Sequence, residues 1–499
     1  MTLPITSLSA LAEHWKHNTT PYYFVSPTHF NLMGTENWVG GWTHINFLDV
    51  FDGSHPGIFV PLRTESPVFE SMEALNAYLL GHRDVIQKMG EDRASLSIPS
   101  PNSRVIFLFF DDTIEALCAE LHLDICLPSH AICREMDSKI VATQLGNSVG
   151  VLSVPNVLTE IRSYKDLVET AAAHQLGTEW VVQTPYGDSG KTTFFISNEA
   201  DYNQVASEIE SQPKVKVMKR IQCVGTAIEA CATRCGTFVG PLMGELIGDP
   251  SLTPYPGGWC GNDLVSEAFT PELRRRTQEM TQRLGDALYA KGYRGYFEVD
   301  YLLDTQSSDV YLGEINPRLS GVTAMTNLSP FCQSHIPLFL LHLTEFSDLK
   351  FDINPAEFNR DSLAVGAAGH TAQFILKYTP DELNIITAAP KSGIYRHTDA
   401  GELVFQRDST DRRDAGPDEA FVLRIMTTSE YAYHGADLAI VFLNTPLIGP
   451  DQKLAPTAAD WIAATRRAFV TRPLTEDEET MVARYNNPGV SFKGIGGNE

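Results

Sequence analysis

The stretch GYFEVDYLLDTQSSDVYLGEINPRLSG, residues 295–321, decides the fold. It holds two runs rich in aromatic and β-branched residues, 295–304 and 309–316, and the polar TQSS lies between them. Runs of this length and composition are typical of β-strands, and a short polar link between two strands predicts a hairpin. The link is longer than the two residues of the tightest hairpins.

One face of this hairpin gathers polar side chains. Glu298 and Asp300 share a face of the first strand, and Glu314 and Asn316 share a face of the second, because side chains alternate along a strand. If the strands pair, these faces coincide and the carboxylates repel one another. Mg²⁺ would relieve that repulsion, since it binds carboxylate oxygens and completes its shell with water and phosphate. Arg318 follows closely and can contact an anionic substrate. An exposed hairpin with charged outer residues is the alternative.

A second glycine-rich stretch, TPYGDSGKTTFF at 184–195, resembles the end of a phosphate-binding P-loop. Pro185 stands where that motif requires its first glycine, and the residues after Lys191 are β-branched and aromatic rather than helical. We therefore predict a strand, a glycine-rich turn and a second strand. Such a hairpin can offer backbone N–H groups and one cation to phosphate as a flap. A plain surface hairpin is the alternative.

The remaining pattern predicts several α/β units. Residues 1 to about 135 alternate buried strands (22–27, 57–62 and 104–112) with a helix at 113–123, which favours an open α/β sheet. Thr270 and Pro271 begin the clearest helix, which ends at Gly292. Further helices are expected at 137–150, 166–177 and 457–470, and further strands at 179–184, 372–378, 421–427 and 437–443.

Composition narrows the class of protein. The 499 residues carry a formal net charge of −24, which argues against nucleic-acid binding. The N-terminal stretch lacks the basic start and apolar run of a secretory signal, and the most apolar stretch, 336–343, is too short to span a bilayer. The eight cysteines lack the spacing of a zinc site, and several lie among apolar residues. We expect a cytoplasmic protein without membrane or nucleic-acid partners.

Residues 292–321 resemble the metal-binding hairpin of ATP-grasp enzymes, a superfamily that includes biotin carboxylase, carbamoyl-phosphate synthetase and D-alanine–D-alanine ligase. The ending EINPRLSG, at 314–321, is the most specific part. REMDSKIVATQLGNSVGVLSVP (134–155) resembles the segment that opens the grasp, and KVKVMKRIQCVGTAIEACAT (214–233) falls where the family keeps its adenine hinge. The order and spacing of these segments match those of the family over roughly residues 100–345.

The resemblance implies a multidomain α/β and α+β fold. A Rossmann-like pre-ATP-grasp domain would occupy residues 1–135, and a two-lobed ATP-grasp domain would occupy 136–345. Within the latter, a flap lobe of about 136–215 would precede a metal-site lobe of about 216–345. A mixed α/β domain, like that of biotin carboxylase relatives, would form residues 346–499.

The same resemblance implies a nucleotide site. Lys139 would contact the α-phosphate, the hinge at 219–221 would read adenine through backbone groups, and Glu229 matches a family glutamate in the strand after the hinge. Many members carry a second lysine on the strand before the flap, where this chain has Gln183. The full set implied for the nucleotide is Lys139, Gln183, Gly187, Ser189, Gly190, Lys191, Lys219, Arg220, Ile221 and Glu229.

Metal and catalytic roles follow in the same way. Asp300 and Glu314, with Asn316, would bind Mg²⁺, or Mn²⁺ in its place. We choose Asp300 over Glu298 because its separation from Glu314 fits the family hairpin, and Glu298 stays open as an alternative ligand. Arg318 would stabilise the phosphate-bearing intermediate. Lys191 on the flap would compensate for the missing lysine and assist catalysis.

The function implied is that of an ADP-forming carboxylate–amine ligase. ATP would convert a small-molecule carboxylate into an acylphosphate, and an amine would displace phosphate to form an amide or peptide-like bond. A bicarbonate-using carboxylase or carbamoyl-type enzyme is one alternative, although biotin carboxylase itself is disfavoured because its long glycine run is missing from the flap. A non-catalytic ATP-binding protein, as in the synapsin branch, is another. The resemblance also suggests a homodimer.

Two smaller features complete the prediction. The glycines of PYPGGWCGND, at 254–263, predict a loop between the hinge and the metal hairpin. This loop would either line the substrate site or serve as a connector. His370 is interpreted as a structural residue.

Overall fold

The computed structural model of the protein describes residues 3–62, 69–95, 102–187, 192–264, 269–364, 370–398 and 400–484, without the side chains of 481–484. Ser189, Gly190 and Lys191, all predicted to lie in the flap turn, fall outside these ranges. Among the described helices, none combines the length and the apolar character needed to cross a membrane.

The N-terminal part is the open parallel sheet that the sequence predicts. Its five strands lie in the order β3-β2-β1-β4-β5, and every pairing is parallel. The five residues of β1 are all buried, as expected for a strand covered on both faces. The elements are α1 (Leu8–Lys16), β1 (Tyr22–Ser26), β2 (Trp42–Asn46), β3 (Ile58–Phe59), α2 (Met72–Gly81), α3 (Arg83–Ala94), β4 (Ser103–Phe107), α4 (Asp112–Glu120) and β5 (Leu123–Ile125), with short 3-10 turns η1 (Phe30–Leu32) and η2 (Thr35–Asn37) after β1.

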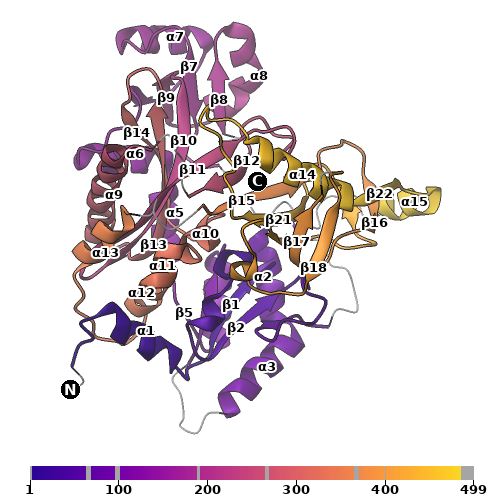
Figure 1. Ribbon diagram of the computed structural model, residues 1–499. Coiled ribbons are helices and arrows are strands. Elements are labelled where there is room, and N and C mark those ends of the chain that lie inside the picture. The colour runs from indigo at the N-terminus through magenta and orange to yellow at the C-terminus, as the bar shows by residue number, and fades with distance from the viewer. Residues whose placement is uncertain are drawn as a thin grey trace.

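A second, four-stranded sheet forms the lobe at the top of Figure 1, in the order β6-β9-β7-β8. The predicted strand–turn–strand of the flap is confirmed, because β7 and β8 pair antiparallel on either side of the turn. Helices α7 and α8 cover one face of this sheet through a common core of side chains. The lobe and the helices that lead into it are α5 (His130–Asp137), α6 (Lys139–Ser148), β6 (Asn156–Thr159), α7 (Tyr164–Ala173), β7 (Trp180–Gln183), β8 (Thr193–Ile196), α8 (Glu199–Glu210) and β9 (Val215–Lys219).

The hairpin at 295–316 is also confirmed, as strands β13 and β14 of a ten-stranded sheet. Helix α9 begins as predicted, with the Thr270 side chain accepting a hydrogen bond from the Leu273 N–H and proline in the first turn. Its apolar stripe packs against the apolar face of β13. The elements are β10 (Cys223–Thr233), β11 (Gly236–Ile247), β12 (Trp259–Asp263), α9 (Pro271–Ala290), β13 (Gly295–Asp304), β14 (Val310–Asn316), α10 (Thr323–Asn327), α11 (Pro330–Ser334), α12 (Leu338–Glu345) and α13 (Pro355–Ser362).

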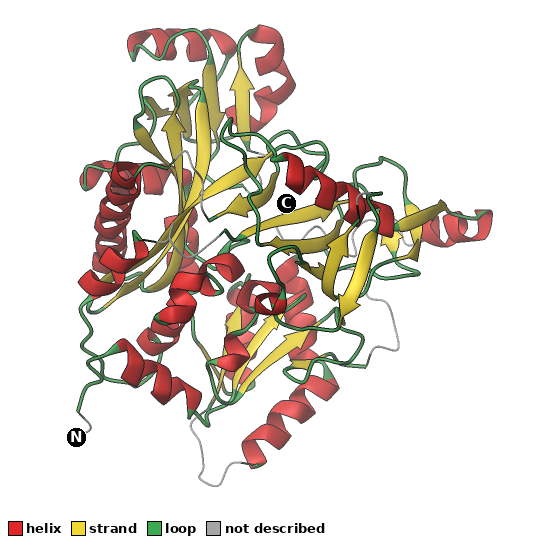
Figure 2. Ribbon diagram, viewed as in Figure 1, coloured by secondary structure: helices red, strands yellow, loops and turns green. Residues whose placement is uncertain are grey.

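The C-terminal part continues the same sheet, and Figure 2 shows its strands running on from the centre of the molecule toward the right. A small three-stranded sheet, β20-β16-β22, lies beside it. The expected strands and the helix near 457–470 are present. These elements are β15 (Ala372–Lys377), β16 (Asn384–Ala388), β17 (Gly393–His397), β18 (Leu403–Arg407), η4 (Arg412–Asp414), β19 (Ala420–Arg424), β20 (Tyr431–Ala432), β21 (Asp437–Leu443), α14 (Pro456–Ala468), β22 (Val470–Pro473) and α15 (Glu476–Arg484).

The predicted loop at 254–263 is wrong in its second half. Residues 259–263 form β12, which pairs with β11 on one side and with β15 on the other. This strand therefore joins the strands of the predicted metal-site lobe to those of the C-terminal part in one sheet. The Asp263 carboxylate anchors the joint, because it accepts hydrogen bonds from the N–H groups of Leu447 and Ile448. Glycine was taken as a loop signal here, but it serves close packing between strands.

Gly261 is the residue at which that packing is tightest. A Cβ placed there would lie 2.5 Å from the Gln373 carbonyl oxygen and 2.6 Å from a methyl group of Leu447. Gly257, four residues earlier, has no atom within 4 Å of the same position.

We expect Gly261→Ala to destabilise the protein by about 1–3 kcal/mol, because the added methyl group forces β12 and β15 apart. The measurement is the midpoint of thermal unfolding. Gly257→Ala is the matched control and should leave the midpoint close to that of the parent protein. Equal midpoints for the two variants would show that the β12–β15 joint is not tightly packed.

Candidate active site

The polar face of the β13–β14 hairpin is assembled by strand register. Glu298 lies opposite Asn316, and Asp300 lies opposite Glu314, so all four side chains share a face. Phe297, Val299 and Tyr301 of β13 point to the opposite face and pack against α9. The predicted convergence of carboxylates is thus present. Asn316 donates a hydrogen bond from Nδ2 to Asp300 Oδ2 at 3.2 Å, which ties the two strands together at this face.

A further carboxylate, Glu245, reaches this cluster from β11. Oxygen atoms of Glu245, Glu298 and Asp300 all lie within 4.8 Å of one another, an arrangement that could hold a metal ion. Strand β10 separates β11 from β13 in the sheet, and its residues at the crossing, Gly225 and Ala227, are small enough to let the carboxylates meet above them.

These carboxylates are held at close quarters in a buried place. Burial and the neighbouring Glu298, Glu245 and Glu314 charges raise the pKa of Asp300 well above its ordinary value. Burial raises the pKa of Glu298 well above its ordinary value too, and that of Glu245 to about 7. Asp300 Oδ1 is buried and has no hydrogen-bond partner among the described residues. The cluster therefore combines crowded carboxyl groups with a carboxylate oxygen that has no partner among the described residues, which suits a hard cation.

Glu314 differs from the other three because a lysine neutralises it. Burial alone would raise its pKa, but the Lys139 ammonium, 2.8 Å from Oε2, and the nearby Arg318 hold that pKa below its ordinary value. Lys139 stands at the first position of α6 and also donates to the carbonyl of Gly187 at 2.9 Å. This one lysine thereby links the base of the flap to the metal hairpin.

Arg318 follows β14 directly and is fixed from two sides. Its Nη1 donates to Asn316 Oδ1 at 3.0 Å, and its guanidinium lies over the ring of Phe109, which follows β4 of the N-terminal sheet. The N-terminal sheet thus reaches the candidate site at the end of one of its strands. Parallel α/β sheets usually present functional groups at the carboxyl ends of their strands, and Phe109 follows the carboxyl end of β4.

Glu229 lies fully buried in β10, opposite Glu298. It is enclosed by hydroxyl groups: Thr323 Oγ1 donates to it at 2.6 Å, Ser320 Oγ at 3.1 Å, and the Tyr296 hydroxyl also donates. Burial raises its pKa to about 7, although these hydrogen bonds oppose the rise. Its role for the nucleotide stays a prediction.

The predicted adenine hinge is the link between β9 and β10. The N–H groups of Lys219 and Arg220 donate to the carbonyls of Pro155 and Glu179, at 3.0 Å each. Because these two donors are engaged, adenine recognition by this link would fall to its carbonyl groups and to Ile221. Arg220 is also held in place over the ring of Phe195 on the flap strand β8.

Gln183 ends β7 on the face of the flap sheet that is turned away from α7 and α8. Its Nε2 donates to Thr193 Oγ1 at 3.1 Å, and its Oε1 is buried without a partner among the described residues. Gln183 is paired in register with Lys216 of β9, a lysine to which the sequence analysis gave no role. Lys216 is 1% exposed and donates to Ser153 Oγ at 3.1 Å. Burial lowers its pKa to about 7, with Glu314 and Lys139 among the charges that it feels.

Sequence reasoning missed Glu245 and Lys216 for the same reason. Each is a single charge inside an apolar strand, GTFVGPLMGELI at 236–247 and VKVMK at 215–219. A buried charge in such a run was the available signal, because a lone ionised group is costly in a protein interior. Which face it would occupy depends on strand pairing, which the local sequence does not specify.

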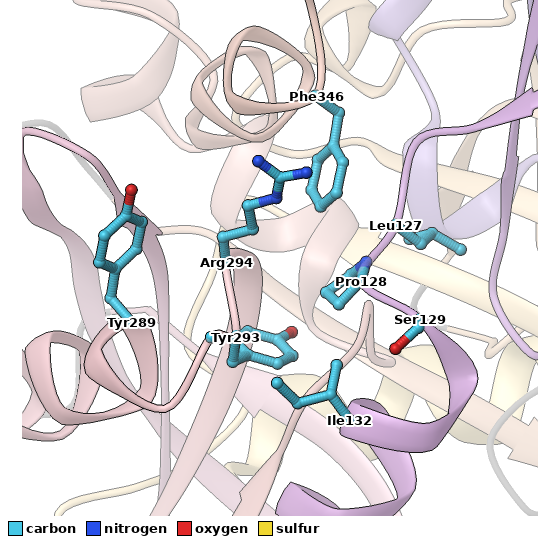
Figure 3. Close-up of a pocket in the computed structure, with 9 residues that line it drawn as sticks. Leu127, Pro128, Ser129, Ile132, Tyr289, Tyr293, Arg294 and Phe346 are labelled. Carbon is cyan, nitrogen blue, oxygen red and sulfur yellow. The ribbon is translucent and has the colours of Figure 1, made fainter.

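A separate cavity of about 440 Å³ lies near the junction of the N-terminal sheet and α9. Figure 3 shows Arg294 beside Phe346 on one side, with Tyr293, Ile132, Pro128 and Ser129 around the rest. None of its lining residues is a carboxylate, so it is distinct from the acidic cluster. Tyr293 also lines a much smaller cavity, and Arg318 is among the residues that line it.

Comparison with known proteins adds to this geometry. The chain matches no protein-family profile. It is 25% identical over 219 residues to the butirosin acyl-carrier protein–L-glutamate ligase of Niallia circulans, an alignment that covers 44% of this chain and 51% of that protein. The chain therefore spans about half the length of the curated relative it matches.

Solved structures cover nearly the whole chain. The biotin carboxylase domain of 2-oxoglutarate carboxylase from Hydrogenobacter thermophilus, solved with MgADP, ADP and bicarbonate, aligns with a TM-score of 0.58 at 10% identity over 91% of each chain. Carboxyaminoimidazole ribonucleotide synthase from Aspergillus clavatus, solved with ATP, aligns with a TM-score of 0.51 at 12% identity, over 90% of this chain and 99% of that one. The chain has the ATP-grasp fold.

Lys139 links the two predicted halves of the site. The flap hairpin β7–β8 comes from one lobe and the acidic hairpin β13–β14 from the other, and Lys139 contacts both. Of the predicted metal residues, Asp300 belongs to the three-carboxylate group, Asn316 bonds to Asp300, and Glu314 is paired with Lys139. Glu298, the alternative ligand, also belongs to the group.

The buried Glu229 gives this ATP-grasp chain a pH-dependent stability. Between its ordinary pKa of 4.5 and its raised pKa of about 7, the unfolded chain loses the proton while the folded protein keeps it. Stability contributed by this group is therefore present below pH 4.5, falls as the pH rises to about 7, and stays low above that.

We expect Glu229→Gln to remove this loss. The difference in unfolding midpoint, variant minus parent, should become more positive from pH 5 to pH 8, as measured by thermal unfolding at each pH. Glu357→Gln, an exposed carboxylate on α13, is the control and should give a flat difference. A flat difference for Glu229→Gln as well would mean that Glu229 is ionised in the folded protein throughout this range.

Proposed function

We propose that the protein is an ATP-dependent, ADP-forming ligase that activates a small-molecule carboxylate as an acylphosphate for attack by an amine. The observation that carries the proposal is the acidic cluster of Glu245, Glu298 and Asp300. Glu314 and Asn316, on the same face of the hairpin, contact Lys139 and Arg318. The curated relative, whose name is that of an acyl-carrier protein–L-glutamate ligase, supports the choice of an amide-forming reaction.

ATP and Mg²⁺ are the cofactors that this site suits, with Mn²⁺ as a substitute. Asp300 fits a metal ion because its Oδ1 is buried without a partner among the described residues, and Glu298 and Glu245 stand beside it. Asn316 orients Asp300, and Glu314 completes the predicted set. Bound Mg²⁺ would supply positive charge that offsets the negative charge of the γ-phosphate.

The chain's own residues would do the rest. A phosphate would compete with Glu314 for the Lys139 ammonium, which places Lys139 to bind the nucleotide and releases Glu314 toward the metal group. Arg318, fixed by Asn316 and Phe109, would bind the anionic substrate and the phosphate that develops on it. The flap, with Gly187 at its base, would exclude the water that hydrolyses an acylphosphate.

The remaining assignments belong to the same proposal. The domain boundaries at 135/136 and 345/346, the nucleotide roles of Gln183 and Glu229, and the catalytic role of Lys191 are retained as predicted. We further propose a cytoplasmic protein that forms a homodimer and acts on small-molecule carboxylate and amine substrates.

The ligase activity can be tested by ADP release. Purified protein with ATP, Mg²⁺ and pools of carboxylates and amino acids should release ADP only with the correct pair, and Glu314→Ala should lower that release by at least about a hundredfold, because the substitution removes a carboxylate oxygen from the proposed metal group. Glu402→Ala, an exposed carboxylate remote in sequence from the hairpin, is the matched control and should keep full activity.

Other outcomes distinguish the competing functions. ADP release that depends on bicarbonate and needs no amine would favour a carboxylase. ATP binding with no ADP release under any substrate pool would favour a non-catalytic nucleotide-binding protein. Full turnover by Glu314→Ala would contradict the assignment of the site.

A further inference from the structure

Lys216 is a buried ammonium that the proposed reaction has not yet used. Strand β9 alternates between the two faces of the flap sheet, with Val215 and Val217 in the core beneath α7 and α8. Lys216 and Met218 point to the other face, toward the acidic hairpin. A buried lysine normally has a carboxylate partner, because an unpaired charge is costly in the interior. Among the described residues, no carboxylate lies within ion-pair distance of Lys216, and its Nζ donates a hydrogen bond to the neutral Ser153 hydroxyl.

The position of Lys216 in the sheet places it next to the strand position where the resemblance predicts a phosphate-binding lysine. It pairs in register with Gln183, so the two side chains stand side by side on one face of adjacent strands. Gln183 occupies the place where the family resemblance leads us to expect a phosphate-binding lysine. The Gln183 amide donates to Thr193, and because an amide is neutral, Gln183 supplies no positive charge to a phosphate.

The surroundings of Lys216 lead to the same site. Ser153, which accepts its hydrogen bond, forms a β-bridge with Leu312 of β14, two residues before Glu314. Lys216 lies close enough to Glu314 and Lys139 for both charges to shift its pKa, Glu314 upward and Lys139 downward. Lys216 therefore stands where the flap sheet meets the acidic hairpin, on the side where Lys139 holds the base of the flap.

We propose that Lys216 binds the phosphates of the nucleotide, supplying from β9 the positive charge that Gln183 does not supply from β7. The proposal rests on the proposed function, because it requires ATP to lie between the flap sheet and the acidic hairpin. The ammonium group is supplied by β9 instead of by the adjacent strand β7, on the same face of the sheet. Lys216 is thus a nucleotide-binding residue of this chain, and Lys139 and Lys216 together offer two ammonium groups to a triphosphate.

The test uses Lys216→Met, which keeps the length and packing of the side chain and removes its charge. We expect the dissociation constant for a non-hydrolysable ATP analogue with Mg²⁺ to rise by about ten- to a hundredfold, because a charged hydrogen bond to phosphate is lost. The midpoint of thermal unfolding without nucleotide should rise, because an unpaired buried charge is replaced by an apolar group. Isothermal titration calorimetry and thermal unfolding measure the two quantities.

A charge exchange gives the sharper result. The double variant Gln183→Lys, Lys216→Met should recover ATP-analogue affinity to within about threefold of the parent protein, because the ammonium returns on the neighbouring strand. Lys214→Met, an exposed lysine two residues before Lys216 along the chain, is the matched control and should leave both affinity and stability unchanged.

Four outcomes would overturn the proposal. Unchanged affinity in Lys216→Met, while the parent protein binds the analogue, would refute the role of Lys216 and leave the proposed function intact. Loss of affinity together with a lower unfolding midpoint would assign Lys216 a structural role. A double variant that binds as weakly as Lys216→Met would show that the two positions do not serve one phosphate site. Failure of the parent protein to bind the analogue at all would instead remove the proposed function and this inference together.

Discussion

The structure depends on one electrostatic constraint, the repulsion among carboxylates that strand register forces together. Pairing of β13 with β14 fixes Asp300 beside Glu314 and Glu298 beside Asn316, and β11 adds Glu245 across a floor of small residues. Burial strengthens the repulsion, since fewer water molecules screen it. Lys139 offsets the charge of Glu314, and the repulsion raises the pKa of Asp300, so this cluster suits a bound cation.

The compensating charges come from parts of the chain that are distant in sequence. Lys139 at the start of α6 neutralises Glu314 and reaches the flap at Gly187. Arg318 lies against Phe109 of the N-terminal part, and Lys216 stands on the flap sheet. The Lys139–Glu314 ion pair thus joins the start of α6 to the acidic hairpin. A division of charge among distant parts of the chain suits an enzyme that closes on a polyanionic substrate, because closure brings the opposing groups together around it.

The ten-stranded sheet explains how these groups keep their places. Strand β12 joins β11 to β15, so the acidic hairpin belongs to the same sheet as the C-terminal strands. Asp263 fastens that joint through two backbone N–H groups. A rigid support of this kind limits the motion of the carboxylates on the acidic hairpin, and a preorganised site requires such restraint.

The sequence by itself determined the local features: both hairpins, helix α9 with its Thr270 cap, and the shared face of Asp300 and Glu314. These follow from alternation, capping and turn chemistry, which act within a few residues. Only the tertiary structure decided that Glu245 joins Asp300 across β10, that Lys216 stands beside Gln183, and that residues 259–263 form a strand. The physical reason is that the pairing of strands distant in sequence is set by the packing of whole sheets. The local sequence around a single charged residue in an apolar strand therefore does not specify which side chain will lie beside it.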